Sequence, residues 1–222
     1  MKASVKPIES LDPRIEQLSQ LFWPLSDLER RIARRLYQLL AQAGPVVVPK
    51  LAERAGVAPQ EAESAIAAWP AVFRNDSGEV IGFWGFTIPP TKHRLIVGKR
   101  TLYTWCAWDT LFIPEILGEP ASVRSISPID SAEIAFEVTA HGVANVSPPD
   151  TVVSFVLPKG ENWTRDVLTN FCHLGHFFRN AHEGREWLRS HPDGFLLPLE
   201  QAYLAGKLKN RYEYGSLEAE HA

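Results

Sequence analysis

The chain has 222 residues, of which 45% are hydrophobic and 22% charged, and its formal net charge is −3. This composition is typical of globular proteins and excludes disordered, collagen-like and disulfide-scaffold proteins. A protein that acts mainly on nucleic acid or anionic lipid would usually be more basic.

The first 25 or so residues predict an irregular arm with a short helix around Ile15–Leu21. This arm has no apolar core of the kind found in signal peptides, and no stretch of the chain approaches the roughly 20 apolar residues that span a bilayer. We therefore expect a cytoplasmic protein without a membrane partner, whose two cysteines are thiols.

Three helices and a hairpin are predicted next. Ser26 is placed to cap a helix whose leucines recur at helical spacing until Gly44-Pro45 ends it, and Val46–Val48 predicts a short strand. Two more helices run from Pro49 to Gly56 and from Ala58 to the residue before Pro70, and a hairpin is centred on Asn75–Gly78. This order is typical of a winged helix-turn-helix.

The charges of this region argue against DNA binding. Residues 1–90 contain ten Lys or Arg and ten Asp or Glu. The third helix, which would read the bases, offers no Lys or Arg, and its polar residues are Gln60, Glu61, Glu63 and Ser64. Phosphate contacts need cations, so no nucleic-acid partner is expected.

The pattern changes after Pro89-Pro90 to a mixture of strands and helices. Strands are predicted at Arg94–Val97, Thr101–Trp105, Ala121–Ser125, Glu133–Thr139 and Val152–Leu157. Helices are predicted at Cys106–Leu117, Thr164–Asn170, Ala181–Ser190 and Leu199–Lys209, and residues 173–178 favour a strand. The fold class is therefore α+β, with a helical winged-helix-like domain over 1–88 and a larger mixed-sheet domain with flanking helices over 89–222.

Cys106 and Cys172 are the residues best suited to chemistry. If a helix begins at Cys106, Asp109 lies on the same helical face three residues later, and the helix N-terminus favours a thiolate. Cys172 has His173 and His176 nearby. The residues alone leave several readings open: two small buried side chains, a zinc site, or a Cys-His nucleophile.

The zinc hypothesis is weakly supported by spacing. Structural zinc sites usually combine two close pairs of ligands, and Cys106 has no such partner. His173 and His176 are three residues apart and would point to opposite faces of a strand.

Two motifs resemble a known family. The segment YTWCAWDTLFIPEILG contains W-C-A-x-D-T-L, and NFCHLGHFF contains F-C-x-x-x-H-F-F. With their surroundings they resemble the organomercurial (alkylmercury) lyases over most of residues 70–210, and the N-terminal helices resemble that family's degenerate winged helix, which does not act on DNA. The resemblance implies that Cys106, Asp109 and Cys172 are catalytic and hold mercury, and that Trp105, Tyr103 and Phe171 line the substrate pocket.

Three positions depart from the family pattern. Ser127 stands near a position where many members have a structural cysteine, and His173 stands where some members have a second thiol next to the catalytic one. Trp108 is bulky beside Asp109 and is expected to narrow the pocket.

The resemblance implies mercury detoxification by protonolysis of a carbon–mercury bond. Mercury is a soft ion that selects thiolates, and a positioned acid can protonate the departing carbon. No dissociable cofactor is expected. The product Hg(II) would stay bound until a cellular thiol or a mercuric reductase removes it, and a monomer or weak dimer is expected. The alternatives are a thiol-based protein that binds or delivers Hg, Cu or Zn without turnover, and a metal-responsive DNA-binding regulator.

Overall fold

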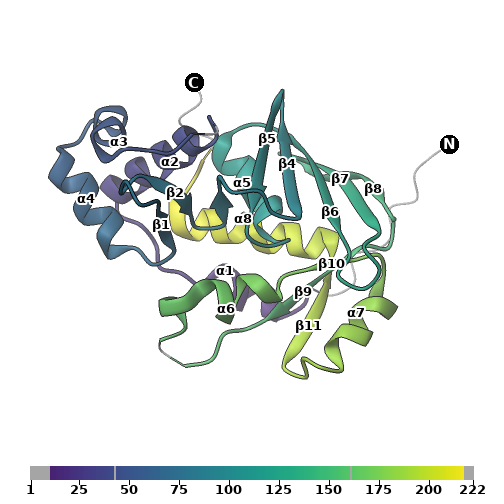
Figure 1. Cartoon of the computed structure of the whole chain (residues 1–222). Helices are drawn as coiled ribbons and strands as arrows, with labels where there is room; N and C mark the ends of the chain where they lie inside the picture. Colours follow the sequence, from purple (N-terminus) through teal and green to yellow (C-terminus); the bar gives the residue numbers. More distant parts are fainter. Residues whose placement is uncertain (1–10, 43, 161, 218–222) are drawn as a thin grey trace.

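The computed structural model describes residues 11–42, 44–160 and 162–217, so residues 1–10 of the predicted arm lie outside it. Its N-terminal part contains four helices and a hairpin. The second, third and fourth helices lie with the hairpin at one end of the molecule, whereas the first helix lies near its middle (Figure 1). The elements are α1 (Arg14–Ser19), α2 (Asp27–Leu40), α3 (Val48–Ala55), α4 (Pro59–Ala68), β1 (Val72–Arg74) and β2 (Val80–Phe83).

The ends of α2 and α3 show why these segments fold as predicted. The Ser26 side chain accepts a hydrogen bond from the backbone of Glu29, whose carboxylate accepts one from the backbone of Ser26 in return. Gly56 ends α3 in the left-handed conformation, which costs glycine little. The strand predicted at Val46–Val48 is wrong: Val46 forms one bridge to Val80, and α3 begins at Val48.

The large sheet has eight strands in the order β1-β2-β3-β5-β4-β6-β7-β8. Every pairing between neighbours is antiparallel. The sheet continues across the predicted boundary at residues 88 and 89, because β2 pairs with β3 and β3 with β5. Its further strands are β3 (Phe86–Thr87), β4 (His93–Val97), β5 (Arg100–Thr104), β6 (Ala121–Ile126), β7 (Glu133–Thr139) and β8 (Gly142–Ser147).

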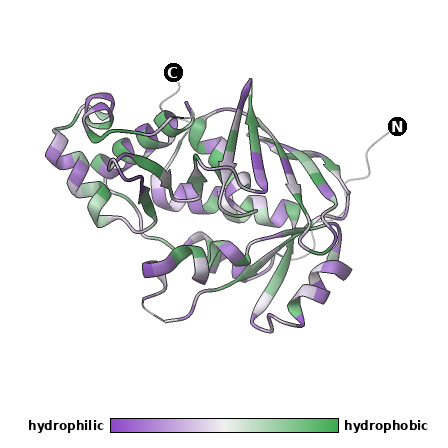
Figure 2. Cartoon of the chain, in the orientation of Figure 1, coloured by the Kyte–Doolittle hydropathy of each residue, from purple (hydrophilic) through white to green (hydrophobic). Residues whose placement is uncertain are grey.

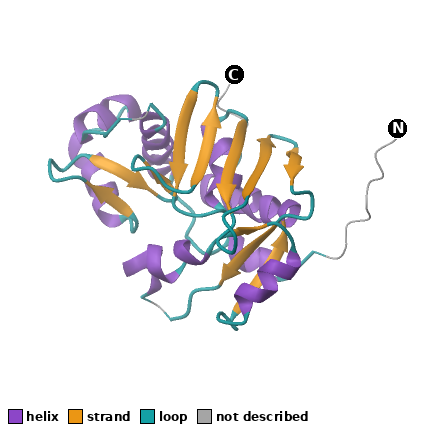
Figure 3. Cartoon of the chain, turned by 45° about the vertical axis from the view of Figure 1, so that its right-hand side comes forward, coloured by secondary structure: helices purple, strands orange, loops and turns teal. Residues whose placement is uncertain are grey.

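A second, three-stranded sheet has the order β10-β9-β11 and lies apart from the large one (Figure 3). Its strands are β9 (Val152–Val156), β10 (Phe177–Phe178) and β11 (Gly194–Pro198). The accompanying helices are α5 (Asp109–Leu117), α6 (Val167–Asn170), α7 (Ala181–Leu188) and α8 (Leu199–Tyr214), with 3-10 turns η1 (Trp163–Asp166) and η2 (Cys172–Leu174).

Helix α8 runs through the middle of the molecule and contacts α1, α5, β8, β9 and β11 (Figure 1). Helix α5 and strand β9 consist mostly of hydrophobic residues, whereas α4 and α7 at the periphery are more hydrophilic (Figure 2). Asn210 of α8 donates to the carbonyl of Phe112, 2.9 Å away, and thereby ties α8 to α5. Helix α8 thus contacts both sheets within one hydrophobic core. Separately, none of the described helices is long and apolar enough to cross a bilayer.

The helical N-terminal part and the sheet-containing remainder confirm the α+β prediction, but several bounds were wrong. Helix α5 begins at Asp109 rather than Cys106, and β5 ends at Thr104 before Trp105. Residues 173–178 form part of a 3-10 turn and only a two-residue strand. Helix α8 extends to Tyr214, and β3, β8 and β11 were not predicted.

Candidate active site

Cys106, Asp109 and Cys172 meet inside the protein. One ligand atom from each lies within 4.8 Å of the others, and all three residues are buried. Cys106 lies in the turn after β5, Asp109 is the first residue of α5, and Cys172 opens η2. The fold therefore brings together two thiols that are far apart in sequence and places a carboxyl group beside both.

The turn before α5 is held by three short hydrogen bonds. The backbone N–H of Cys106 donates to Oδ2 of Asp109 over 2.8 Å. Thr104 Oγ1 donates to the carbonyl of Cys106 over 3.0 Å, and Thr110 Oγ1 to that of Ala107 over 2.7 Å. The sequence predicted that Asp109 and Cys106 share one face of a helix. In the structure the carboxyl group of Asp109 instead contacts Cys106 across the turn that precedes α5.

Two glycines let the backbone approach the site closely. At Gly85, where φ is +94°, an added Cβ would lie 2.5 Å from Cγ of Asp109. At Gly175 an added Cβ would lie 3.1 Å from Cβ of Cys106 and 3.3 Å from its Sγ. Both glycines also accept backbone hydrogen bonds from the site, Gly85 from Trp105 and Gly175 from Ala107. Side chains at these positions would displace the reactive groups.

Burial dominates the electrostatics of the site. It raises the pKa of Asp109 to about 6, against smaller lowering effects from hydrogen bonds with Cys106 and from the charge of Lys209. Burial, a hydrogen bond with Cys172 and the charge of Asp109 raise the pKa of the Cys106 thiol well above its usual range. For Cys172 the hydrogen bond with Cys106 lowers the pKa, but burial and Asp109 together outweigh it.

A narrow cavity of about 20 Å³ reaches Asp109 and Cys172, leaving room for about one water molecule. Cys106 does not line it, and only 1% of its surface is exposed. The wall is mainly aromatic and aliphatic: Phe22, Ala71, Trp84, Gly85, Trp105, Trp108, Phe112, Val167, Phe171 and Lys209 complete it. A ligand larger than water must displace some of these side chains.

Trp105 and Phe171, two of the three predicted pocket residues, line this cavity. Tyr103 is not among the residues that line it: it lies within β5, opposite Thr87 and Arg94, between two inward-facing neighbours. Trp108 contributes to the wall and is fixed by a 3.0 Å hydrogen bond from Nε1 to the carbonyl of Ala202.

The histidines near Cys172 lie outside the thiol cluster. His173 is exposed, and Nδ1 of His176 lies 3.0 Å from Nζ of Lys92. Among the described residues, neither histidine joins the group of potential metal ligands. Ser127 is buried, and its hydroxyl accepts a hydrogen bond from the backbone N–H of Ile129.

Sequence reasoning missed Lys209. Its ammonium donates to Glu213 over 2.8 Å, with only 3% and 0% of the two side chains exposed, and it lines the cavity. A Lys and a Glu four residues apart usually predict an exposed ion pair on a helix, so this spacing does not indicate that the two side chains are buried.

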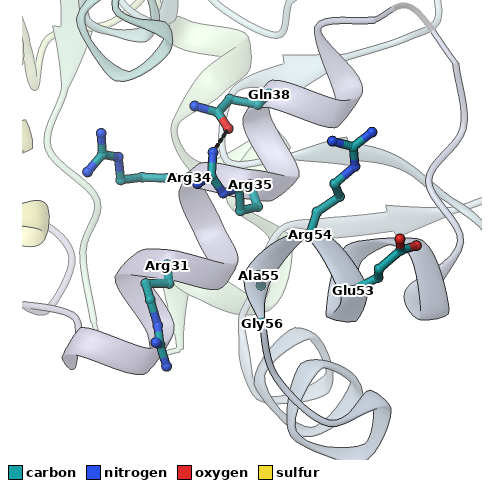
Figure 4. A pocket seen from close by; sticks show the side chains of 8 residues that line it. All are labelled: Arg31, Arg34, Arg35, Gln38, Glu53, Arg54, Ala55 and Gly56. Carbon is teal, nitrogen blue, oxygen red and sulfur yellow. Dashed lines mark hydrogen bonds between the residues drawn. The ribbon is translucent and has the colours of Figure 1, made fainter. Parts of the chain in front are cut away.

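A second hollow, of about 440 Å³, lies between α2 and α3 and is lined by Arg31, Arg34, Arg35, Gln38, Glu53 and Arg54 with Ala55 and Gly56. Figure 4 shows that these arginine side chains point in different directions, and that Arg35 turns toward Gln38, to which it donates over 2.6 Å. The guanidinium groups do not converge on one point, so this hollow lacks the geometry of a preformed anion site.

The chain is similar to known proteins along most of its length. Residues 86–209 match the family model for alkylmercury lyase, and residues 24–84 match that for the helix-turn-helix domain of alkylmercury lyase. An alkylmercury lyase of Streptomyces lividans is 38% identical over 78% of this chain and 79% of its own length, and one of Staphylococcus epidermidis is 34% identical over 81% and 82%.

A solved structure supports the same fold. The crystal structure of the mercury-bound form of MerB2 superposes with a TM-score of 0.74 and covers 90% of this chain and 99% of that one, at 22% sequence identity. The family models, the relatives and the two cysteine motifs agree along the chain. The chain therefore belongs to the alkylmercury lyase family.

Proposed function

We propose that this chain cleaves the carbon–mercury bond of organomercurials by protonolysis, with Cys106 and Cys172 binding mercury and Asp109 delivering the proton. The observation that carries the proposal is that two thiols and one carboxyl group come together, buried, beside a narrow cavity. The relatives that carry the name alkylmercury lyase support the substrate class.

We infer that Cys172 binds mercury first, because Cys172 lines the cavity whereas Cys106 does not and is only 1% exposed. Mercury is soft and thiophilic, so it exchanges its incoming ligand for this sulfur. Coordination then brings the metal next to Cys106, whose thiol loses its proton as it binds.

Asp109 accepts that proton and passes it to carbon. Between a free thiol and a free aspartate the transfer is uphill by about 6 kcal/mol. Mercury removes most of this barrier on the sulfur side, and burial raises the pKa of Asp109 to about 6 on the carboxyl side. A group with a pKa near neutrality can act first as a base and then as an acid.

The overall reaction balances without a change in oxidation state. The cation R–Hg⁺ and two cysteine thiols give the hydrocarbon RH, mercury(II) bound to two thiolates, and one released proton. Within this proposal no dissociable cofactor is required. Both cysteines must be thiols, which suits the predicted cytoplasmic location, and a cellular thiol or a mercuric reductase would remove the ion.

The test is hydrocarbon release. Purified, reduced protein is incubated with phenylmercuric acetate and excess thiol, and benzene is measured by gas chromatography. We expect many benzene molecules per chain from the wild type and none above background from Cys172→Ser. Binding of one mercury per chain without benzene would contradict the proposal and favour the alternative, a thiol-based protein that binds or delivers Hg, Cu or Zn.

A further inference from the structure

Lys209 is the only cationic side chain among the described residues that line the cavity. It reaches the wall from α8, while Asp109 and Cys172 lie on the same cavity. The rest of the wall is almost entirely aromatic or aliphatic. A buried positive charge in such a wall requires an explanation, because it loses its hydration there.

Part of the Lys209 ammonium group faces aromatic rings. Nζ donates to Glu213 Oε2 over 2.8 Å, which uses one of three N–H groups. It lies 4.2 Å from the ring centroid of Phe112, with Phe22 and Tyr214 farther away at 5.8 Å and 6.0 Å. Ring faces attract cations, and an anionic oxygen is a stronger partner for the same N–H groups.

Stability alone does not account for this ion pair. Burying two charges costs hydration, and apolar residues of similar size are often as stabilising in the same place. Both side chains are nevertheless inside, at the wall of the cavity. Phe112, which lies under the ammonium, is also one helical turn beyond Asp109 on α5, so Lys209 faces the space next to the proton donor.

We propose that Lys209 binds an anionic substituent on the organic group, so that this chain prefers aryl mercurials that carry a carboxylate over neutral aryl mercurials of similar size. The inference rests on the proposed function, because it places mercury at the two thiols and the organic group along the aromatic wall. Phe22 and the tryptophans of the wall must move to admit either ring. Only the carboxylate-bearing ring gains a charged partner once inside.

The test compares 4-(chloromercuri)benzoate with phenylmercuric chloride in excess thiol, as the ratio of their kcat/KM values. Lys209→Met combined with Glu213→Leu removes both charges and keeps the packing volume, which avoids leaving Glu213 buried alone. We expect this double variant to lower the ratio about tenfold, the effect of losing one charge-assisted hydrogen bond. Glu213→Gln keeps the cation and is expected to keep or increase the preference.

Lys207→Met is the matched control, because Lys207 lies on the same helix, is partly exposed and pairs with Glu115 outside the cavity. It is expected to leave the ratio unchanged. A folded Lys209→Met/Glu213→Leu protein that retains the wild-type ratio would overturn the inference, and thermal unfolding verifies that each variant is folded.

Failure of the proposed function gives a different result. In that case neither mercurial releases hydrocarbon from the wild type. Competition between the two mercurials for the thiol pair then tests Lys209 by itself, read as the bound fraction of each by mass spectrometry. Preferential binding of the carboxylate-bearing compound, lost in the double variant, supports the role of Lys209; equal binding overturns it.

Discussion

The hollow between α2 and α3 and the cavity beside α5 show opposite designs. The first is large, about 440 Å³, and its arginine side chains spread apart around it (Figure 4). The second holds about 20 Å³, yet two thiols and a carboxyl group converge beside it within 4.8 Å. Burial raises the pKa of both Cys106 and Asp109 at this second cavity. Convergence and exclusion of water, rather than size, mark the reactive site.

Replacing either cysteine is expected to have the largest effect on hydrocarbon release. Cys106→Ser or Cys172→Ser replaces a soft sulfur ligand by a hard oxygen, so we expect hydrocarbon release to fall by about 1000-fold or more. Turnover of phenylmercuric acetate checks this, with mercury content measured in parallel. Full turnover by either variant would show that the reaction does not require both thiols.

A smaller but still large effect is expected at Gly85. Gly85→Ala would place Cβ 2.5 Å from Cγ of Asp109, so the carboxyl group must move, and we expect kcat to fall about 100-fold. Gly78→Ala is the matched control: its φ of +78° is similarly strained, but nothing lies within 4 Å of its Cβ. Equal losses of activity in the two variants would show that backbone strain, and not the position of Asp109, is responsible.

The burial of Asp109 should make the free energy of unfolding depend on pH. Because its pKa is raised to about 6, the folded state retains a proton that the unfolded state has released, so this group's contribution to stability falls as the pH rises from about 4 to 6. Asp109→Asn removes this pH-dependent loss of stability. We expect its free energy of unfolding, measured with denaturant, to exceed that of the wild type by at most about 3 kcal/mol at pH 8 and by less at pH 5. A variant less stable than the wild type at pH 8 would contradict this.

Substitutions in the hollow between α2 and α3 are expected to have the smallest effect on activity. Arg31→Ala combined with Arg54→Ala should change kcat/KM for phenylmercuric acetate by less than about twofold, because these side chains lie away from the thiol site. A tenfold change would mean that the two regions are coupled, and the contrast between them would then fail.

Local signals predicted much of this molecule. Ser26 and Gly56 marked helix ends because capping depends on short-range hydrogen bonds and on one backbone conformation. The motifs identified Cys106, Asp109 and Cys172, which the fold then brought together. The two-residue strand β3 was missed because so short a segment carries no periodic pattern.

The remaining errors have tertiary causes. Helix α5 starts at Asp109 because the turn before it is held by the carboxyl group of Asp109 itself, which helical spacing does not reveal. The family resemblance implies that Tyr103 lines the pocket, but in the structure it lies within β5 between the buried Leu102 and Thr104 and does not line the cavity. Lys209 was overlooked because only the packing of α8 against α5 makes its position internal.

The proposed function requires that Asp109 protonates carbon while two thiols hold mercury. A single turnover of phenylmercuric acetate in D₂O, followed by gas chromatography with mass spectrometry, tests it most directly. We expect the wild type to release monodeuterated benzene in step with mercury bound to the protein, and Asp109→Asn to bind mercury without releasing benzene. Release of monodeuterated benzene by Asp109→Asn at the wild-type rate would contradict the account.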